Sequence, residues 1–256
     1  MDRKRFFLGL ALLVFMVLLF ISFAGFSEVD TDISLSSFSS SHPLGTDIYG
    51  RDFLSRLSLG ALISMTLALV ITLISVFLGV LLSFLMAGSG IVSFFSWLLS
   101  DSIKSISSII LSLFLSSIFG PGFLVLIVSI GISHIPDIAR TSYSRIKMIE
   151  NEDFVLYARA EGMSRWEIAL FHVIPHMRGE VLSQALSIFS SSILTEASLS
   201  FLGAGIPVLY PSIGSILSEG RLLMLARPSY VIIPSFVLFL ISLSLHLMHE
   251  GLESDS

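Results

Sequence analysis

Residues 57–100 read LSLGALISMTLALVITLISVFLGVLLSFLMAGSGIVSFFSWLLS, a run of 44 residues without one charged side chain. A helix that crosses the hydrocarbon core of a bilayer needs about 20 apolar residues. The run is therefore long enough for two membrane-spanning helices, and Gly88-Ser89-Gly90 supplies the break between them. This stretch alone indicates an integral membrane protein.

The composition of the whole chain agrees with a membrane protein. Hydrophobic residues make up 54% of the 256 positions and charged residues only 13%, about half of the roughly 25% found in soluble domains. The formal net charge of −5 provides no basic face for nucleic acid, which we do not expect as a partner. With no cysteine in the chain, disulfides, thiolate zinc sites and iron–sulfur clusters are excluded.

The charge-free runs predict an all-α membrane protein with about six transmembrane helices. The predicted helices cover residues 6–27, 58–87, 91–119, 123–142, 178–202 and 228–249. This pattern divides the chain into an N-terminal anchor helix (1–27), an external loop (28–57) and a five-helix core (58–256). A cleaved signal peptide is the alternative for the first run, but the apolar segment of a signal peptide usually has only 7–15 residues.

Positive charges predict the orientation, because Lys and Arg concentrate in cytoplasmic loops. With the N-terminus inside and the helices alternating, nine basic residues lie inside and four outside. The inside set is Arg3, Lys4, Arg5, Arg140, Arg145, Lys147, Arg159, Arg165 and Arg178, and the outside set is Arg51, Arg56, Arg221 and Arg227. The count favours both termini in the cytoplasm and leaves one large cytoplasmic loop at residues 143–177.

That loop carries the signals of two short helices joined by a turn. Asn151 is a candidate N-cap for the first helix, and Gly162 is placed to end it in a left-handed conformation. Ser164 with Glu167 three residues later has the pattern of a capping box for the second helix. Pro175 is predicted to stop that second helix.

The loop's apolar side chains leave two interpretations open on spacing alone. The chain offers apolar contact area from Phe154, Val155, Tyr157, Ala158, Trp166 and Ile168. Such a pair of helices either rests on lipid headgroups, as interfacial helices do, or docks to a partner protein.

Three sequence blocks resemble those of a known family. Ala158-x-Ala160-x-Gly162, followed by Pro175, resembles the "EAA" loop of ABC importer permeases. HPLGTDIYGRDFLSR at 42–56 is similar to the block before the second helix in dipeptide, oligopeptide and nickel permeases. EASLSFLGAG at 196–205, then PSIG at 211–214 and EGR at 219–221, resembles the fifth helix and last external loop of the C-type subunit.

The resemblance implies half of a translocation pathway in the cytoplasmic membrane of a bacterium or archaeon, for peptides, nickel or sugars. Its partners would be a homologous second permease in a heterodimer, two ATP-binding subunits that hold ATP-Mg, and an external substrate-binding protein. This chain itself would bind no cofactor and would not be an enzyme. The loop residues that would dock to the ATPase are Phe154, Tyr157, Ala158, Ala160, Glu161, Gly162, Ser164 and Pro175.

The head of the loop departs from the family pattern. Leu156-Tyr157-Ala158 stands where the family usually has Glu-Ala-Ala. Glu152, Asp153 and Glu161 are nearby acids that would have to replace the missing Glu in pairing with basic groups of the ATPase.

Three charged residues inside the predicted spans are candidates for the translocation path. Asp101 and Lys104 lie three residues apart on one helix face, where they can neutralise each other or line the path. Glu196 lacks a predicted partner within its helix, and an unpaired acid inside the membrane indicates a functional role. It would pair with the partner permease or face the external mouth of the path.

Other motifs are set aside. Gly45-x4-Gly50 has the spacing of a phosphate loop but lacks the Lys-Ser/Thr that follows in such loops, so ATP must be hydrolysed by another chain. We do not predict a metal site at His172/His176 or at His246/His249. The alternatives to an ABC permease are a secondary transporter, which would show repeats, and an intramembrane enzyme, which needs a nucleophile–base constellation in its spans.

Overall fold

The computed structural model describes residues 3–25, 34–36, 39, 42–150, 152–163, 165–207 and 209–253, and this part of the chain is helical apart from its connections and one bridge between Thr46 and Asp52. The long helices are α1 (Arg3–Phe23), α2 (Phe53–Ala87), α5 (Phe123–Ile149), α9 (Arg178–Phe201) and α11 (Ser229–Glu253). The shorter ones are α3 (Ile91–Lys104), α4 (Ser108–Phe119), α6 (Asp153–Ala160), α7 (Arg165–Ile168), α8 (Ile174–His176) and α10 (Ile213–Leu222).

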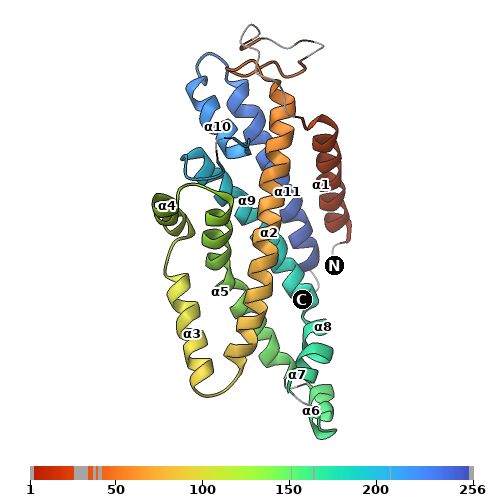
Figure 1. The fold of residues 1–256 in the computed structure, drawn as a ribbon. Helices are drawn as coiled ribbons and strands as arrows, with labels where there is room; N and C mark the ends of the chain where they lie inside the picture. The colour runs from red at the N-terminus through yellow and green to blue at the C-terminus, as the bar shows by residue number, and fades with distance from the viewer. Residues whose placement is uncertain are drawn as a thin grey trace.

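The long helices run along one direction, with α10 at one end of the molecule and α6 and α7 at the other (Figure 1). By length and apolar composition α1, α2, α5 and α11 can each cross a membrane. The predicted single helix at 91–119 is wrong, because α3 and α4 meet at 82° across a break after Lys104. Counted together, α3 and α4 make a fifth candidate span. The predicted helix at 178–202 is present as α9, which is more polar and carries three charged residues and seven serines.

Capping explains why α2 begins at Phe53, five residues before its predicted start. The carboxylate of Asp52 accepts a hydrogen bond from the amide of Ser55 at 2.7 Å, which satisfies a free N–H of the first turn. His42 Nδ1 contacts the other carboxylate oxygen at 2.9 Å. At the other end of the molecule α5 continues to Ile149, two turns beyond its predicted end.

Glycines allow the closest approaches between the long helices. A Cβ on Gly79 of α2 would lie 2.5 Å from Cβ of Ile138, on α5, the helix against which α2 packs most extensively. In α1, a Cβ on Gly9 would lie 2.5 Å from the carbonyl oxygen of Ser244 in α11. Gly251 of α11 packs equally closely against the backbone of Phe6. Helices approach this closely in membranes where small residues line the interface.

The outer surface is rich in large apolar side chains. Phe77, Leu124 and Phe119 are each at least 70% exposed, an arrangement that would be unfavourable in water because a soluble monomer rarely presents large contiguous apolar patches. Inside, buried side chains of α1, α2, α9 and α11 form the largest apolar cluster. The exposed apolar surface is what a protein embedded in lipid requires.

Candidate functional site

The turn between α6 and α7 has the conformation that the sequence predicts. Gly162 has a φ of +87°, in the left-handed region, and the amide of Met163 donates to the carbonyl of Ala158 at 3.1 Å, closing a Schellman-type cap. A Cβ on Gly162 would meet nothing within 4 Å. The glycine is therefore required by the backbone conformation and not by crowding.

The apolar face of this loop packs against the chain's own helices. Val155, Ala158 and Ile168 are buried in one cluster with Ile146 of α5 and Met177. The loop is therefore held rigidly on the ends of α5 and α9, and these side chains are not available to lie on lipid. The structure corrects the expectation that Ala158 contacts a partner, because its side chain is turned inward.

The opposite face of α6 is free. Tyr157 is 74% exposed, and Ala160, Glu161, Gly162 and Pro175 are also exposed. Phe154 is half-buried and stacks on His176, with ring centroids 4.7 Å apart. Asn151, Ser164 and the side chains of Leu156 and Trp166 lie outside the described residues. The helix α6, which contains Tyr157 and Ala160, lies at the extreme end of the molecule (Figure 1).

The sequence predicted that Pro175 ends the second short helix, and this prediction is wrong. A π-helical turn at Ala169–Val173 precedes Pro175, and the helical path continues through α8 to α9 with a local distortion at Met177. A proline lacks an N–H and crowds the carbonyl four residues earlier, and the wider π turn accommodates this defect. The loop thus connects to α9 through a nearly continuous helical path.

Neither histidine pair forms a metal site in the described residues, which contain no group of three or more His, Asp or Glu side chains arranged to hold a metal ion. His176 Nδ1 contacts the carbonyl oxygen of His172 at 2.7 Å. His246 Nε2 lies 3.2 Å from Glu250 Oε1, and His249 contacts Ser183.

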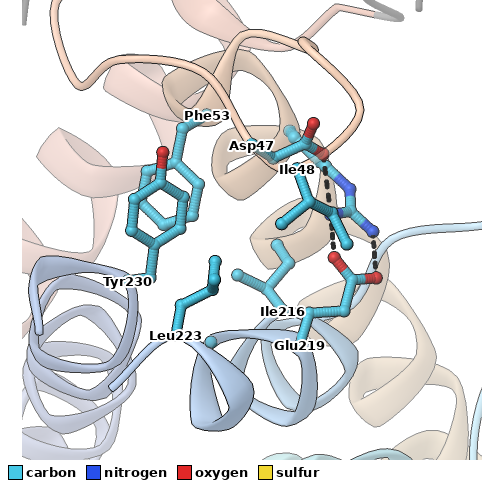
Figure 2. Close-up of a pocket in the computed structure, with 9 residues that line it drawn as sticks. Asp47, Ile48, Phe53, Ile216, Glu219, Leu223 and Tyr230 are labelled. Carbon is cyan, nitrogen blue, oxygen red and sulfur yellow. Dashed lines mark hydrogen bonds and ion pairs between the residues drawn. The ribbon is translucent and has the colours of Figure 1, made fainter. Parts of the chain in front are cut away.

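An ion network at the opposite end joins the 42–56 block to α10, and sequence analysis assigned it no role. Arg56 is only 7% exposed; its guanidinium donates to Glu219 Oε1 at 2.6 Å and to Asp47 Oδ2 at 3.0 Å. Figure 2 shows the carboxylates of Asp47 and Glu219 on one side of a pocket, where dashed lines mark these interactions, and Tyr230 next to Phe53 on the other side. The Tyr230 hydroxyl donates to the carbonyl of Thr46. The opposite charges of Arg56 and of Asp47 and Glu219 were the sequence signal that could have predicted this network.

Glu196 has a partner within its helix, contrary to the prediction. Ser200 Oγ donates to its Oε1 at 2.6 Å, and the carboxyl is fully buried. Around it α9 meets α2 and the start of α10, where a Cβ on Gly214 would lie 2.1 Å from the carbonyl oxygen of Ala197. In the single chain the Glu196 carboxyl therefore lies in the packing between helices, and its Oε2 has no hydrogen-bond partner among the described residues. Its predicted role at the translocation path stays a prediction.

Asp101 and Lys104 do not pair with each other, which corrects a second expectation. Each forms an ion pair with α5: Asp101 with Arg140 and Lys104 with Asp137, both at 2.5 Å. Acid–base pairs three apart on one helix contribute only about 0.2–0.5 kcal/mol, so opposite charges on a neighbouring helix replace them easily. We call these four residues the charged quartet.

The α5 members of the charged quartet lie near the middle of that helix, and the α3 members lie in the last turn of α3. Asp137 follows the start of α5 by 14 residues and precedes its end by 12, about 21 and 18 Å along a helix. A charge at that depth against lipid costs about 2.5–3.5 kcal/mol on insertion scales. The quartet side chains are nevertheless 28–63% exposed in the single chain, so this face requires protein or water beside it.

Comparison with known proteins identifies the family. Residues 75–255 match the profile described as binding-protein-dependent transport system inner membrane component. The dipeptide transport system permease protein DppC of Alkalihalophilus pseudofirmus is 28% identical over 90% of this chain and 76% of its own length. The glutathione transport system permease protein GsiD of Pectobacterium atrosepticum is 31% identical over 84% of this chain and 71% of its own length. A di/tripeptide permease DppC of Pseudomonas aeruginosa is 32% identical over 82% and 69%.

Solved structures support the same fold. An amino acid ABC transporter crystallised with histidines superposes with a TM-score of 0.61 at 16% identity, covering 78% of this chain and 94% of that one. The methionine transporter MetNI in an inward-facing conformation superposes with a TM-score of 0.53 at 18% identity, covering 75% of this chain and 96% of that one. Such subunits are non-catalytic, multi-pass components of the inner membrane. The chain belongs to the family of inner-membrane permease components of binding-protein-dependent ABC importers.

Proposed function

We propose that this permease forms one half of the translocation pathway of a peptide importer. It pairs with a homologous second permease, docks to two ATP-binding subunits that hold ATP-Mg, and receives its solute from an external binding protein. The relatives named for dipeptides, di/tripeptides and glutathione support a small peptide as the solute. The observation that carries the proposal is the rigidly seated loop with its free face at one end of the molecule.

The free face of α6 is the proposed contact with an ATP-binding subunit. Exposed Glu161, together with exposed Glu152 and Asp153 at the start of the helix, supplies the negative charge that the family's missing Glu would have provided. When the ATP-binding subunits close, the loop moves with them. The helical path from α7 to α9 then carries this displacement to the opposite end, where α9 packs on α10, so that the pathway alternates between its two openings.

We propose that both termini lie in the cytoplasm, with α6 inside and α10 outside. Arg140 belongs to the charged quartet and not to a loop, so the inside count falls from nine to eight against four outside. The excess of positive charge on the α6 side remains, and it favours the same orientation.

Cysteine labelling tests this orientation in a chain that contains no cysteine of its own. Leu225→Cys, at a fully exposed position near α10, is expected to react with an impermeant thiol reagent added to sealed cells. Glu161→Cys is expected to react only after the cells are opened. Labelling of Glu161→Cys in sealed cells would reverse the orientation.

Reconstitution tests the function itself. Liposomes that contain both permeases and the ATP-binding subunits, with the binding protein outside, are expected to accumulate labelled Ala-Ala only when ATP is supplied to the ATP-binding subunits. Omission of any one component should abolish uptake. Uptake driven by an ion gradient without ATP would instead support a secondary transporter.

A further inference from the structure

The face of α5 that carries the charged quartet is polar along most of its length. Ser133, Asp137, Thr141 and Ser144 recur at intervals of three and four residues and are all partly or fully exposed. This spacing places them on one side of the helix. A membrane helix with a polar stripe at its middle requires a protein neighbour or a water-filled path along that stripe.

The break between α3 and α4 lies near α5 (Figure 1), and Lys104, just before the break, pairs with Asp137 of this stripe. Ser105, Ile106 and Ser107 leave the helix there, and all three are exposed. Non-helical backbone at membrane depth is tolerated only where protein buries it or where it lines a water-filled cavity. The break and the stripe, on two neighbouring helices, therefore both require protein or water beside them.

The quartet presents its two α3 charges outward. Asp101 is 63% and Lys104 48% exposed, whereas their partners Arg140 and Asp137 are 42% and 28% exposed. Arg140 Nε and His134 Nε2 are buried without hydrogen-bond partners among the described residues. The α5 members thus hold and orient Asp101 and Lys104, which keep open sides for a ligand.

From this geometry we infer that the charged quartet is a binding site in the pathway for the two charged ends of a zwitterionic peptide, an inference that rests on the proposed function. Asp101 receives the ammonium group and Lys104 receives the carboxylate. Residues three apart on a helix have Cβ atoms about 5–6 Å apart, and two extended residues of a peptide span at most about 7 Å. The spacing of the opposite charges therefore suits a short peptide.

Cysteine accessibility in nanodiscs tests where this face lies, with the complete transporter assembled. Ser105→Cys and Thr141→Cys are expected to react with an impermeant reagent. Leu73→Cys, at an exposed apolar position near the middle of α2, is the lipid-facing control and should not react. If the first two are as unreactive as the control, the partner permease covers this face and the inference fails.

Protection of Ser105→Cys by defined probes tests the ligand class. Ala-Ala at millimolar concentration is expected to slow the labelling. N-acetyl-Ala-Ala and Ala-Ala amide each lack one charge and should need about tenfold higher concentration, the factor for losing one charge-assisted hydrogen bond. Equal protection by all three probes, or by none, would overturn the assignment of the two charges.

Two matched double variants test whether protection depends on the charged quartet or on any ion pair of α5. Asp101→Asn/Arg140→Gln removes one quartet pair without changing the net charge, and it should abolish protection by Ala-Ala. Arg145→Gln/Glu180→Gln removes another ion pair of α5, at 3.0 Å, and should retain protection. If the quartet variant fails to assemble, the exchange Asp101→Arg/Arg140→Asp keeps the pair; restored assembly with restored protection would show a purely structural pair and overturn the site.

The reconstituted uptake assay keeps the two proposals distinguishable. Uptake of Ala-Ala without protection at Ser105→Cys would refute the proposed binding site and would still support peptide import. Protection without ATP-driven uptake would support the site and count against peptide import.

Discussion

Replacing Gly162 by Val is expected to leave the permease inserted in the membrane and paired with its partner, while ATP hydrolysis is uncoupled from transport. The φ of +87° costs a residue with a Cβ roughly 1–2 kcal/mol, and a β-branched residue more. An energy of this size changes a conformational equilibrium by about 5–30-fold. Co-purification of the ATP-binding subunits and transport in the same membranes measure the effect.

Two controls isolate the backbone strain at Gly162. Gly162→Asn should retain most of the coupling, because Asn tolerates the left-handed conformation far better than Val. Gly179, at the start of α9, has an open Cβ site like that of Gly162 but no positive φ, so Gly179→Ala should be nearly neutral. Normal ATPase retention and normal transport in Gly162→Val would refute the assignment of this loop as the coupling element.

Arg56→Met is expected to produce the largest loss of stability. It leaves Asp47 and Glu219 without their shared guanidinium at the junction of the 42–56 block, α2 and α10. Breaking a buried ion pair by removing one partner costs about 3–5 kcal/mol; we expect about 3, because Glu219 remains partly exposed. Thermal unfolding of the detergent-solubilised permease pair, followed by circular dichroism, measures the change.

The double variant Arg56→Met/Glu219→Gln should recover much of this loss. It leaves only Asp47, which still has its ion pair with Arg51 at 2.8 Å. Arg5→Met serves as a matched control, because its ion pair with Glu250 is exposed at both ends and should contribute less than about 1 kcal/mol. A double variant as unstable as the single one would show that Arg56 acts through packing and not through charge.

The helix positions could be predicted from charge-free runs and glycine breaks, because lipid imposes apolar composition on every span. The break after Lys104 was missed because Ser105, Ile106 and Ser107 contain neither glycine nor proline, although Asp101 and Lys104 end the charge-free run just before it. The two charged residues next to the break form their ion pairs with the neighbouring helix α5. Periodicity within one segment carries no information about that neighbour.

In the candidate site, too, local features could be predicted from the sequence and contacts between distant segments could not. The conformation of Gly162 is a local property of the backbone, and local sequence predicted it correctly. The inward orientation of Ala158 and the partners of Asp101 and Lys104 depend on α5 and α9, which are close in space and not in sequence. The π turn before Pro175 was missed because a proline indicates a helix end unless the surrounding chain can absorb the lost hydrogen bond.

The contact between α1 and α11 has a consequence for how the protein is made. Gly9 and Gly251 bring together the first and last helices of the described chain, and Arg5 pairs with Glu250 at 2.9 Å. The ribosome must synthesise more than 200 further residues after α1 before α11 emerges, which takes about 10–40 s at common elongation rates. During that interval α1 lies in the bilayer without this neighbour, so the packing of α1 is completed only after α11 has been inserted.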